Sequence, residues 1–300
     1  MKLHSIETGF FKLDGGAMFG VVPKSIWNKL NPADENNLCT WSMRLLLIEH
    51  GDRLILVDTG IGNKQDQKFF SHYHLHGEAS LEKSLAANGF QKKDITDVIL
   101  THLHFDHCGG AIEIIADKLV PAFPQATYWS SEQHWKWAIS PNDREKASFL
   151  KENILPIKES GQLKFVENWL DLHETSAETV LPAGGRETLK TVPFLDQICL
   201  RYAYGHTDAM ILPQLTYQGR TLVFVADLLP STGHLPIPYV MAYDMFPLTT
   251  IQEKKSFLTE AAQKDYILFF EHDPNHECCS LQVTEKGVRI KETFRLEELS

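Results

Sequence analysis

Four side chains of types that bind metal ions fall within six residues in the first half of the chain. They are His102, His104, Asp106 and His107, and two glycines follow shortly after them. Neutral imidazole and carboxylate oxygen are ligands that zinc and iron(II) accept. Burying such a cluster without a cation would carry a large desolvation cost. The alternative, a solvated histidine-rich loop, fits poorly directly after the apolar run 98–100. The pattern therefore indicates a metal site.

This His-x-His-x-Asp-His segment resembles the signature of the metallo-β-lactamase superfamily. Four further segments match that family in its own order along the chain. They are Asp58 in LILVDTG, His206 in YGHTDAM, Asp227 in LVFVAD and His272 in ILFFEHD. Together the matches span residues 58–272, which is most of the sequence. The resemblance implies an α/β (α+β) fold, a four-layer αββα sandwich with the metals at one edge.

The resemblance also implies two metal sites. The ligands of the first are His102, His104 and His206. The ligands of the second are Asp106, His107 and His272. Asp227 is expected to lie between the two metals and share its carboxylate, whereas Asp58 is expected to orient a ligand without binding metal. Two divalent ions are implied, with zinc favoured over iron or manganese, and a hydroxide between them would attack the substrate while Asp106 accepts or relays a proton.

The spelling HLHFDHCGG and the segment order are most similar to the lactonase and methyl parathion hydrolase branch. This implies hydrolysis of a small lactone, ester or phosphotriester, with N-acyl homoserine lactones as one candidate substrate. Several lactonases of that branch carry a tyrosine three residues after the bridging aspartate. Here the run is Asp227-Leu228-Leu229-Pro230, so that tyrosine is absent. Tyr239, Tyr243 or His234 in the following loop could substitute for it.

Two apolar segments are candidates for the walls of a substrate pocket. Met18 and Phe19 lie between glycines in GGAMFG, and the loop 228–247 is rich in Pro, Met and aromatic residues. Such surfaces suit an acyl chain or an aromatic leaving group. The alternative is that they close the core or form a dimer interface. The predicted pocket residues are Met18, Phe19, His234, Tyr239 and Tyr243.

A second histidine run, His72, His74 and His76, stands apart from these motifs. Alternation in an extended segment would place the three imidazoles on one face, as an additional metal site. The alternative is an exposed loop or a flap near the active site, because no neighbouring carboxylate or cysteine completes a ligand set.

Apolar periodicity and turn signals predict alternating strands and helices, compatible with helices that cover sheets. A hairpin is expected at 42–49 and 53–58, and residues 1–37 are expected to be irregular with short strands. Helices are predicted at 79–88, 131–139, 143–155 and 249–264. Further strands are predicted at 97–101, 125–129, 198–204, 210–217, 221–226 and 266–270, with a closing hairpin at 281–293. No Gly/Ser linker divides the chain, which favours one domain over 1–300.

Composition narrows the class of protein. The chain has 300 residues, 43% hydrophobic residues and a formal net charge of −10. The acidic balance argues against a nucleic-acid partner, and no apolar run is long enough to span a membrane. Five cysteines without framework spacing and the lack of a signal-like N-terminus favour a cytoplasmic protein. We expect a small-molecule substrate, and a homodimer is compatible with the apolar loops.

Two other functions are alternatives. The ligand set can also hold iron, which would support redox or sulfur chemistry on the same fold, although no flavin domain is attached. Nucleic-acid processing is the second alternative, and the net charge counts against it.

Overall fold

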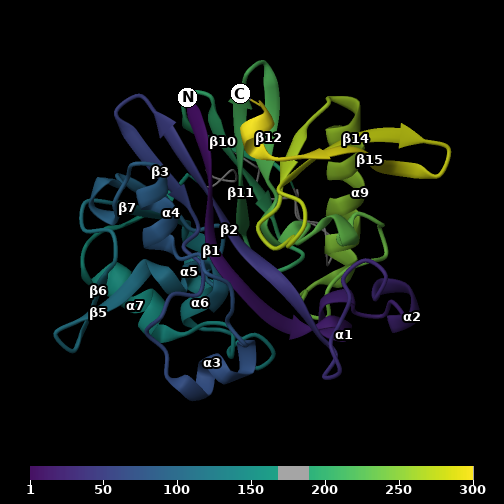
Figure 1. Ribbon diagram of the computed structural model, residues 1–300. Helices are drawn as coiled ribbons and strands as arrows, with labels where there is room; N and C mark the ends of the chain where they lie inside the picture. The colour runs from purple at the N-terminus through teal and green to yellow at the C-terminus, as the bar shows by residue number, and fades with distance from the viewer. Residues whose placement is uncertain (168–188, 300) are drawn as a thin grey trace, which may run out of the picture.

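The computed structural model describes residues 1–167 and 189–299, and its strands form two large sheets (Figure 1). The first sheet has the strand order β1-β2-β3-β4-β7-β8, at Lys2–Asp14, Leu38–His50, Arg53–Val57, Asp97–Ile99, Thr127–Ser131 and Leu163–Val166. The second has the order β15-β14-β13-β12-β11-β10-β9, at Gly287–Phe294, Cys278–Thr284, Ile267–Phe269, Arg220–Phe224, Met210–Tyr217, Ile198–Ala203 and Thr191–Leu195. A separate hairpin pairs β5 (Ile112–Ile115) with β6 (Lys118–Pro121).

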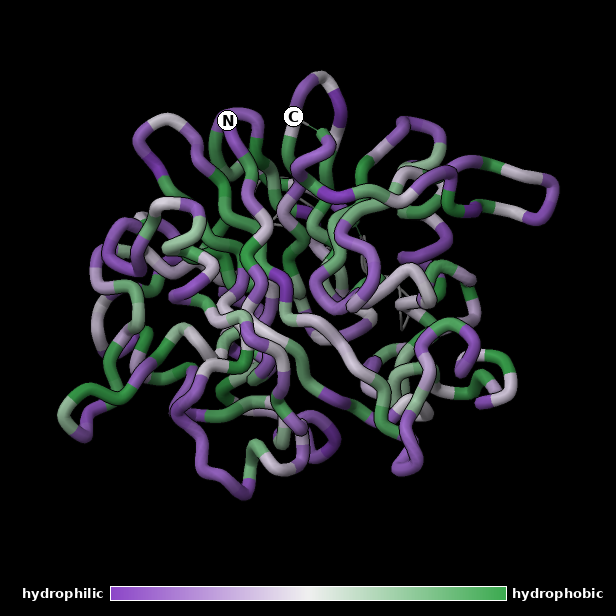
Figure 2. The backbone as a smooth tube through the Cα atoms, in the orientation of Figure 1, coloured by the Kyte–Doolittle hydropathy of each residue, from purple (hydrophilic) through white to green (hydrophobic). Residues whose placement is uncertain are grey.

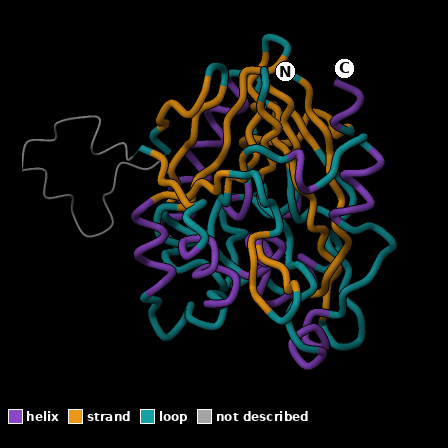
Figure 3. The backbone as a smooth tube through the Cα atoms, turned by 90° about the vertical axis from the view of Figure 1, so that its left-hand side faces the viewer, coloured by secondary structure: helices purple, strands orange, loops and turns teal. Residues whose placement is uncertain are grey.

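In residues 1–167 and 189–299, the α-helices are short except for one. They are α1 (Gly15–Phe19), α2 (Lys24–Trp27), α3 (Gln67–Tyr73), α4 (Leu81–Ala87), α5 (Phe105–Cys108), α6 (Glu132–Ile139), α7 (Lys151–Glu159) and the long α9 (Pro247–Gln263). Strands fill most of the upper half of the molecule in Figure 3, and short helices and loops gather below them. Within the described ranges, none of the helices is both long enough and apolar enough to cross a bilayer.

Alternation along β2 explains the layering. Leu46 and Ile48 point into the core between the two sheets, whereas Leu45 and Leu47 point to the opposite face of the first sheet. That outer face is covered by apolar side chains of α4, α6 and α7. On the other side, α9 buries Phe257 against the second sheet. The result is the four-layer αββα sandwich, with apolar residues along the central strands and hydrophilic ones on the peripheral loops (Figure 2).

Several predicted elements are confirmed, but the prediction for residues 1–37 was wrong. The first segment of this region is β1, a thirteen-residue strand paired antiparallel with β2. Ile6 and Phe11 are both buried, although an odd spacing would place them on opposite faces of a regular strand. A bulge between Glu7 and Phe10, where Gly9 has a φ of 110°, breaks the alternation and hides the strand from pattern analysis.

The predicted helix 143–155 was also placed incorrectly, because α7 begins only at Lys151 and continues to Glu159. Asn142 explains the late start. Its side chain accepts hydrogen bonds from the backbone N–H groups of Arg144 and Glu145, which stabilises a turn in place of a helix.

Strand direction brings the chemically important loops together. In the first sheet β3, β4 and β7 are parallel, and in the second sheet β12 is parallel to β13. The loops that follow these strands therefore leave from the same end of each sheet. Four of these loops, after β3, β4, β12 and β13, carry all but one of the aspartates and histidines singled out from the sequence. The exception is His206, which follows β10, and β10 runs in the same direction as β12 because both are antiparallel to β11.

Candidate metal centre

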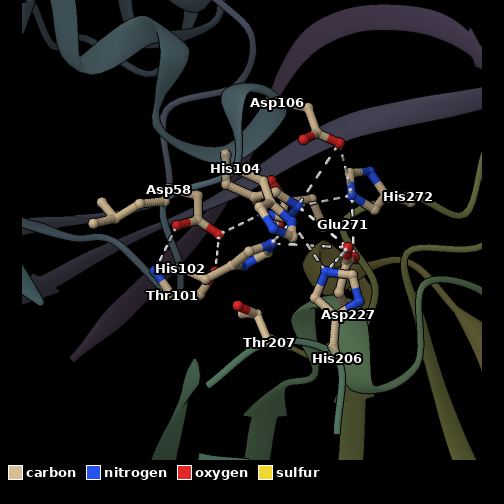
Figure 4. A network of polar contacts seen from close by, with 12 residues as sticks. Asp58, Thr101, His102, His104, Asp106, His206, Thr207, Asp227, Glu271 and His272 are labelled. Carbon is tan, nitrogen blue, oxygen red and sulfur yellow. Dashed lines mark hydrogen bonds and ion pairs between the residues drawn. The ribbon is translucent and has the colours of Figure 1, made fainter. Parts of the chain in front are cut away.

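Four buried side chains converge in a first group (Figure 4). His102, His104, His206 and Asp227 each offer one ligand atom, and these atoms lie within 4.8 Å of one another. The Nδ1 atom of His104 is 3.0 Å from Nε2 of His102 and 3.1 Å from Nε2 of His206. The Oδ2 atom of Asp227 lies 3.1 Å from the same His206 nitrogen.

A second group contains Asp106, His107 and His272, with ligand atoms also within 4.8 Å of one another. The Nε2 atoms of the two histidines are 3.1 Å apart, and Oδ2 of Asp106 is 3.8 Å from Nε2 of His272. Asp227 reaches this group as well, because its Oδ1 lies 3.3 Å from His272 Nε2. One carboxylate therefore faces both groups, and the structure brings together all seven side chains that the sequence suggested as ligands.

The loop after β4 owes its shape to a glycine pair. His102 and His104 follow the strand, and α5 then carries Asp106 and His107. A Cβ atom on Gly109 would lie 2.1 Å from the carbonyl oxygen of Ile61, and one on Gly110 would lie equally close to Thr59. Only glycine lets the loop approach the segment after β3 this closely.

The outer nitrogen of each histidine faces an acceptor. Nδ1 of His107 lies 3.1 Å from Asp58 Oδ2 and 3.0 Å from Glu271 Oε2. Asp58 also accepts hydrogen bonds from the backbone and hydroxyl of Thr101, so it joins the ends of β3 and β4. The Nδ1 atom of His272 is 2.8 Å from the carbonyl oxygen of Ser42.

Two further carboxylates complete this outer set. Asp244 Oδ1 is 3.0 Å from His206 Nδ1, and Glu145 Oε1 is 2.9 Å from His104 Nε2. The sequence analysis missed both of these residues, and it also missed Glu271. Glu271 had a local signal, since it stands directly before His272 at a strand end. Asp244 and Glu145 had none, because they are 38 and 41 residues from their partners in the chain.

Electrostatics favour a neutral ring at one position and an ionised carboxylate at another. Burial, reinforced by neighbouring imidazoles, holds the pKa of His102 well below its usual value. Burial opposes ionisation of Asp227, but the charges of nearby histidines outweigh it and hold its pKa well below the usual range; they are His206, His107 and His272. A neutral imidazole beside an ionised carboxylate is the protonation state in which both bind a metal ion.

The residues present fit a divalent metal ion. Acceptors beside the outer nitrogens favour the ring hydrogen there, which leaves lone pairs on the inner nitrogens. In that neutral tautomer the inner nitrogens, which lie about 3 Å from one another, carry no hydrogen. Oδ1 of Asp227 is buried and accepts no hydrogen bond from the described part of the chain. A cation would satisfy all of these atoms, and the mixture of imidazole and carboxylate suits zinc, iron or manganese.

A cavity of about 390 Å³ opens beside the two groups, and Asp106, Asp227 and His272 form part of its wall. Of the predicted pocket residues, Met18 and Tyr243 line it. Met241 and Met245, which belong to the predicted wall segment 228–247, also line it. Tyr73, Phe105 and Arg144 line it as well, and the sequence analysis did not assign these three to the pocket.

The other predicted pocket residues lie behind the wall, which corrects the expectation for them. Phe19 and His234 are almost fully buried, and their rings stack with centroids 4.6 Å apart. Nε2 of His234 lies 2.9 Å from the Met18 carbonyl oxygen, and Tyr239 meets Phe19 edge-on at 6.5 Å. These three residues support the wall, and the cavity lining does not include them.

The histidine run 72–76 is not an extended segment. Tyr73 ends α3, and His74 adopts a left-handed conformation with φ of 45°. His72, His74 and His76 are exposed, and in the described ranges no group able to hold a metal includes them. This exposure agrees with the interpretation of the run as an exposed segment, and it does not support the alternative of an additional metal site on a shared imidazole face.

Comparison with known proteins places this site in a family. The sequence pattern of the metallo-beta-lactamase superfamily matches residues 45–272. The chain therefore belongs to that superfamily.

Among curated proteins, a probable metallo-hydrolase of Mycobacterium tuberculosis is 32% identical over 114 residues, and an N-acyl homoserine lactonase of a Bacillus species is 27% identical over 165 residues. These matches cover 35% and 52% of this chain, but only 34% and 56% of the respective relatives.

Two solved structures share the fold over nearly the whole chain. A probable metal-dependent hydrolase from Staphylococcus aureus superposes with a TM-score of 0.83 and 28% identity, covering 98% of this chain and 96% of its own. A dizinc quorum-quenching lactonase in complex with the product N-hexanoyl-L-homoserine gives a TM-score of 0.74 at 22% identity, covering 98% and 95%.

Proposed function

We propose that the protein is a dinuclear metal-dependent hydrolase that opens a small lactone or cleaves an ester or phosphotriester. The observation that carries the proposal is the position of Asp227, whose carboxylate lies 3.1 Å from His206 Nε2 in the first group of buried ligands and 3.3 Å from His272 Nε2 in the second. His102, His104 and His206 would hold one metal, and Asp106, His107 and His272 the other. Zinc is the favoured ion, in keeping with the dizinc lactonase of similar fold.

The metals, when bound, would supply a nucleophile from water near neutral pH and polarise the bond under attack. The chain itself supplies orientation and proton transfer. Asp106 reaches the cavity as well as the second group, so its carboxylate can take up a proton from an attacking water. Glu145, Asp244 and the Asp58–Glu271 pair fix the outer faces of the rings.

The cavity favours a small substrate with an apolar part. Its wall combines the carboxylates and imidazoles of the site with thioether and aromatic side chains of Met18, Met241 and Phe105. Such a lining suits an acyl chain or an aromatic leaving group beside the reacting bond.

The test is hydrolysis by protein reloaded with zinc, manganese or cobalt, assayed on a panel of γ-lactones, N-acyl homoserine lactones, aryl esters and aryl phosphotriesters. We expect turnover of at least one class. His104→Ala should abolish this turnover and release one equivalent of metal, measured by elemental analysis. His72→Ala, which removes an exposed imidazole, should leave activity and metal content unchanged. A metal-loaded wild type that is inert on the whole panel contradicts the proposal.

A further inference from the structure

Helix α3 brings a tyrosine into the cavity from a segment that belongs to none of the ligand motifs. Asp66 begins the helix by accepting a hydrogen bond from the Phe69 backbone N–H, and Tyr73 is its last residue. The spacing of four residues puts Phe69 and Tyr73 on one face of the helix. Both rings pack on Phe105, with centroids 5.4 and 4.7 Å away respectively. Tyr73 is therefore held beside the residue that precedes Asp106.

A second phenol reaches the same cavity from the loop after η4 (Thr232–His234). Tyr243 lines the wall and keeps 40% of its surface exposed. The neighbouring Asp244 contacts His206, which fixes this part of the loop to the metal centre. Tyr73 and Tyr243 are thus far apart in sequence but share one wall with Asp106.

Across residues 1–167 and 189–299, neither the Tyr73 nor the Tyr243 hydroxyl makes a hydrogen bond to another group, and both residues keep part of their surface exposed. The hydroxyls of Tyr128, Tyr202 and Tyr266, in contrast, hydrogen-bond to protein oxygens. Two phenols that face a cavity with free hydroxyls are available to donate to a bound molecule.

We propose that Tyr73 and Tyr243 are substrate-contacting residues whose hydroxyls hold the oxygen on which negative charge develops during hydrolysis. When the carbonyl or phosphoryl centre is attacked, its oxygen becomes anionic, and a donor already aimed at that position lowers the barrier. The position three residues after Asp227 cannot fill this role, because Pro230 has no side-chain donor. This inference rests on the proposed hydrolase function.

The test compares Tyr73→Phe, Tyr243→Phe and the double variant in the metal-loaded full chain. Phenylalanine keeps the aromatic ring, which at position 73 packs on Phe105, and removes only the hydroxyl. We expect kcat for the best substrate to fall about tenfold in each single variant and by more than about 100-fold in the double variant, because in each single variant the remaining donor partly covers the loss of the other. KM should change much less, since the contact strengthens as charge develops.

Two measurements separate this role from a structural one. Metal content and Tm should stay at wild-type values. Hexanoate, a carboxylate product analogue, should inhibit the double variant more weakly, with an inhibition constant that is at least several-fold higher. Tyr239→Phe is the matched control, because its ring packs on Phe19 behind the wall. The inference is overturned if the double variant keeps kcat within threefold of an active wild type. Failure of the hydrolase proposal is distinguishable, because the metal-loaded wild type would then be inactive on the whole substrate panel.

Discussion

Asp244 shows how one outer carboxylate can control a ligand. Its Oδ1 lies 3.0 Å from His206 Nδ1, and both side chains are buried. Removing the acceptor in Asp244→Ala frees the ring to rotate and lowers its basicity. We therefore expect metal affinity to fall about 10- to 100-fold, measured by competition with a chromogenic chelator. Asp143→Ala removes a carboxylate that is 98% exposed and should leave the affinity unchanged. Equal losses in both variants would contradict the orienting role.

Substitution of Gly109 tests whether the fold has room for a Cβ atom at this position. Its φ and ψ of −60° and −40° are open to any residue, so only the contact with the Ile61 carbonyl oxygen requires glycine. Gly109→Ala should lower the free energy of unfolding by more than about 3 kcal/mol, measured with urea. Gly219→Ala is the control. It has φ of 78° but open space around the Cβ, so backbone strain alone should cost about 1 kcal/mol. Similar costs for the two variants would refute the steric explanation.

The candidate metal ligands could be predicted from the sequence, but the carboxylates Asp244 and Glu145 that contact the outer nitrogens of the histidines could not. The ligands follow strand ends in a fixed order, and chain-local motifs mark each one. Asp244 and Glu145 reach their histidine partners only after the chain has folded. No motif near either residue in the sequence therefore indicates which histidine it contacts.

At the scale of elements, α9 is fixed to the second sheet by an ion pair. Arg201 on β10 is buried and donates to Glu260 at 2.8 Å. Although burial opposes ionisation, hydrogen bonds from Arg201 and Lys264 lower the Glu260 pKa to about 2 from its usual 4.5. A lowered carboxyl pKa adds stability above about pH 4.5, and this stability is lost as the pH falls toward 2.

Replacement of this carboxylate should therefore matter most at neutral pH. Glu260→Gln leaves the buried Arg201 without its counter-ion, and we expect a loss of about 2 kcal/mol at pH 7. The loss should shrink as the pH drops from 4.5 toward 2, in urea unfolding at each pH. Glu132→Gln, which breaks an exposed pair with Lys136, should cost less than about 0.5 kcal/mol. A constant difference across the pH range would rule out the assigned cause.

The elements that the sequence misplaced share a cause, since in each a local exception breaks the periodic signal. The bulge at Gly9 disguises β1, and the turn at Asn142 delays α7. In the histidine run, polar residues 72, 74 and 76 alternate as in a strand, while the apolar spacing of Phe69 and Tyr73 specifies a helix. The cavity-lining role of Tyr73 follows from that helix and is invisible to an alternating pattern.

In the whole molecule, the proposed metal centre joins two halves that pack as separate sheets. His102, His104, Asp106 and His107 follow a strand of the first sheet, whereas His206, Asp227 and His272 lie in loops of the second. The backbones also meet here, because the N–H groups of Ser42 and Arg44 on β2 donate to the carbonyl oxygens of His272 and Glu271 respectively. Metal bound between these loops would link the sheets at their shared edge.

Chelation should consequently destabilise the entire fold. Metal at 1,000 times its dissociation constant adds about 4 kcal/mol to the native state, and for a chain of this size we expect EDTA to lower Tm by about 10 °C. Scanning calorimetry with and without chelator measures the shift. In Asp227→Ala, which removes the carboxylate facing both groups, the EDTA-dependent shift should fall by at least half, whereas Asp143→Ala should retain it. Equal Tm values with and without EDTA in a wild type shown to hold metal would mean that the ions do not connect the two sheets.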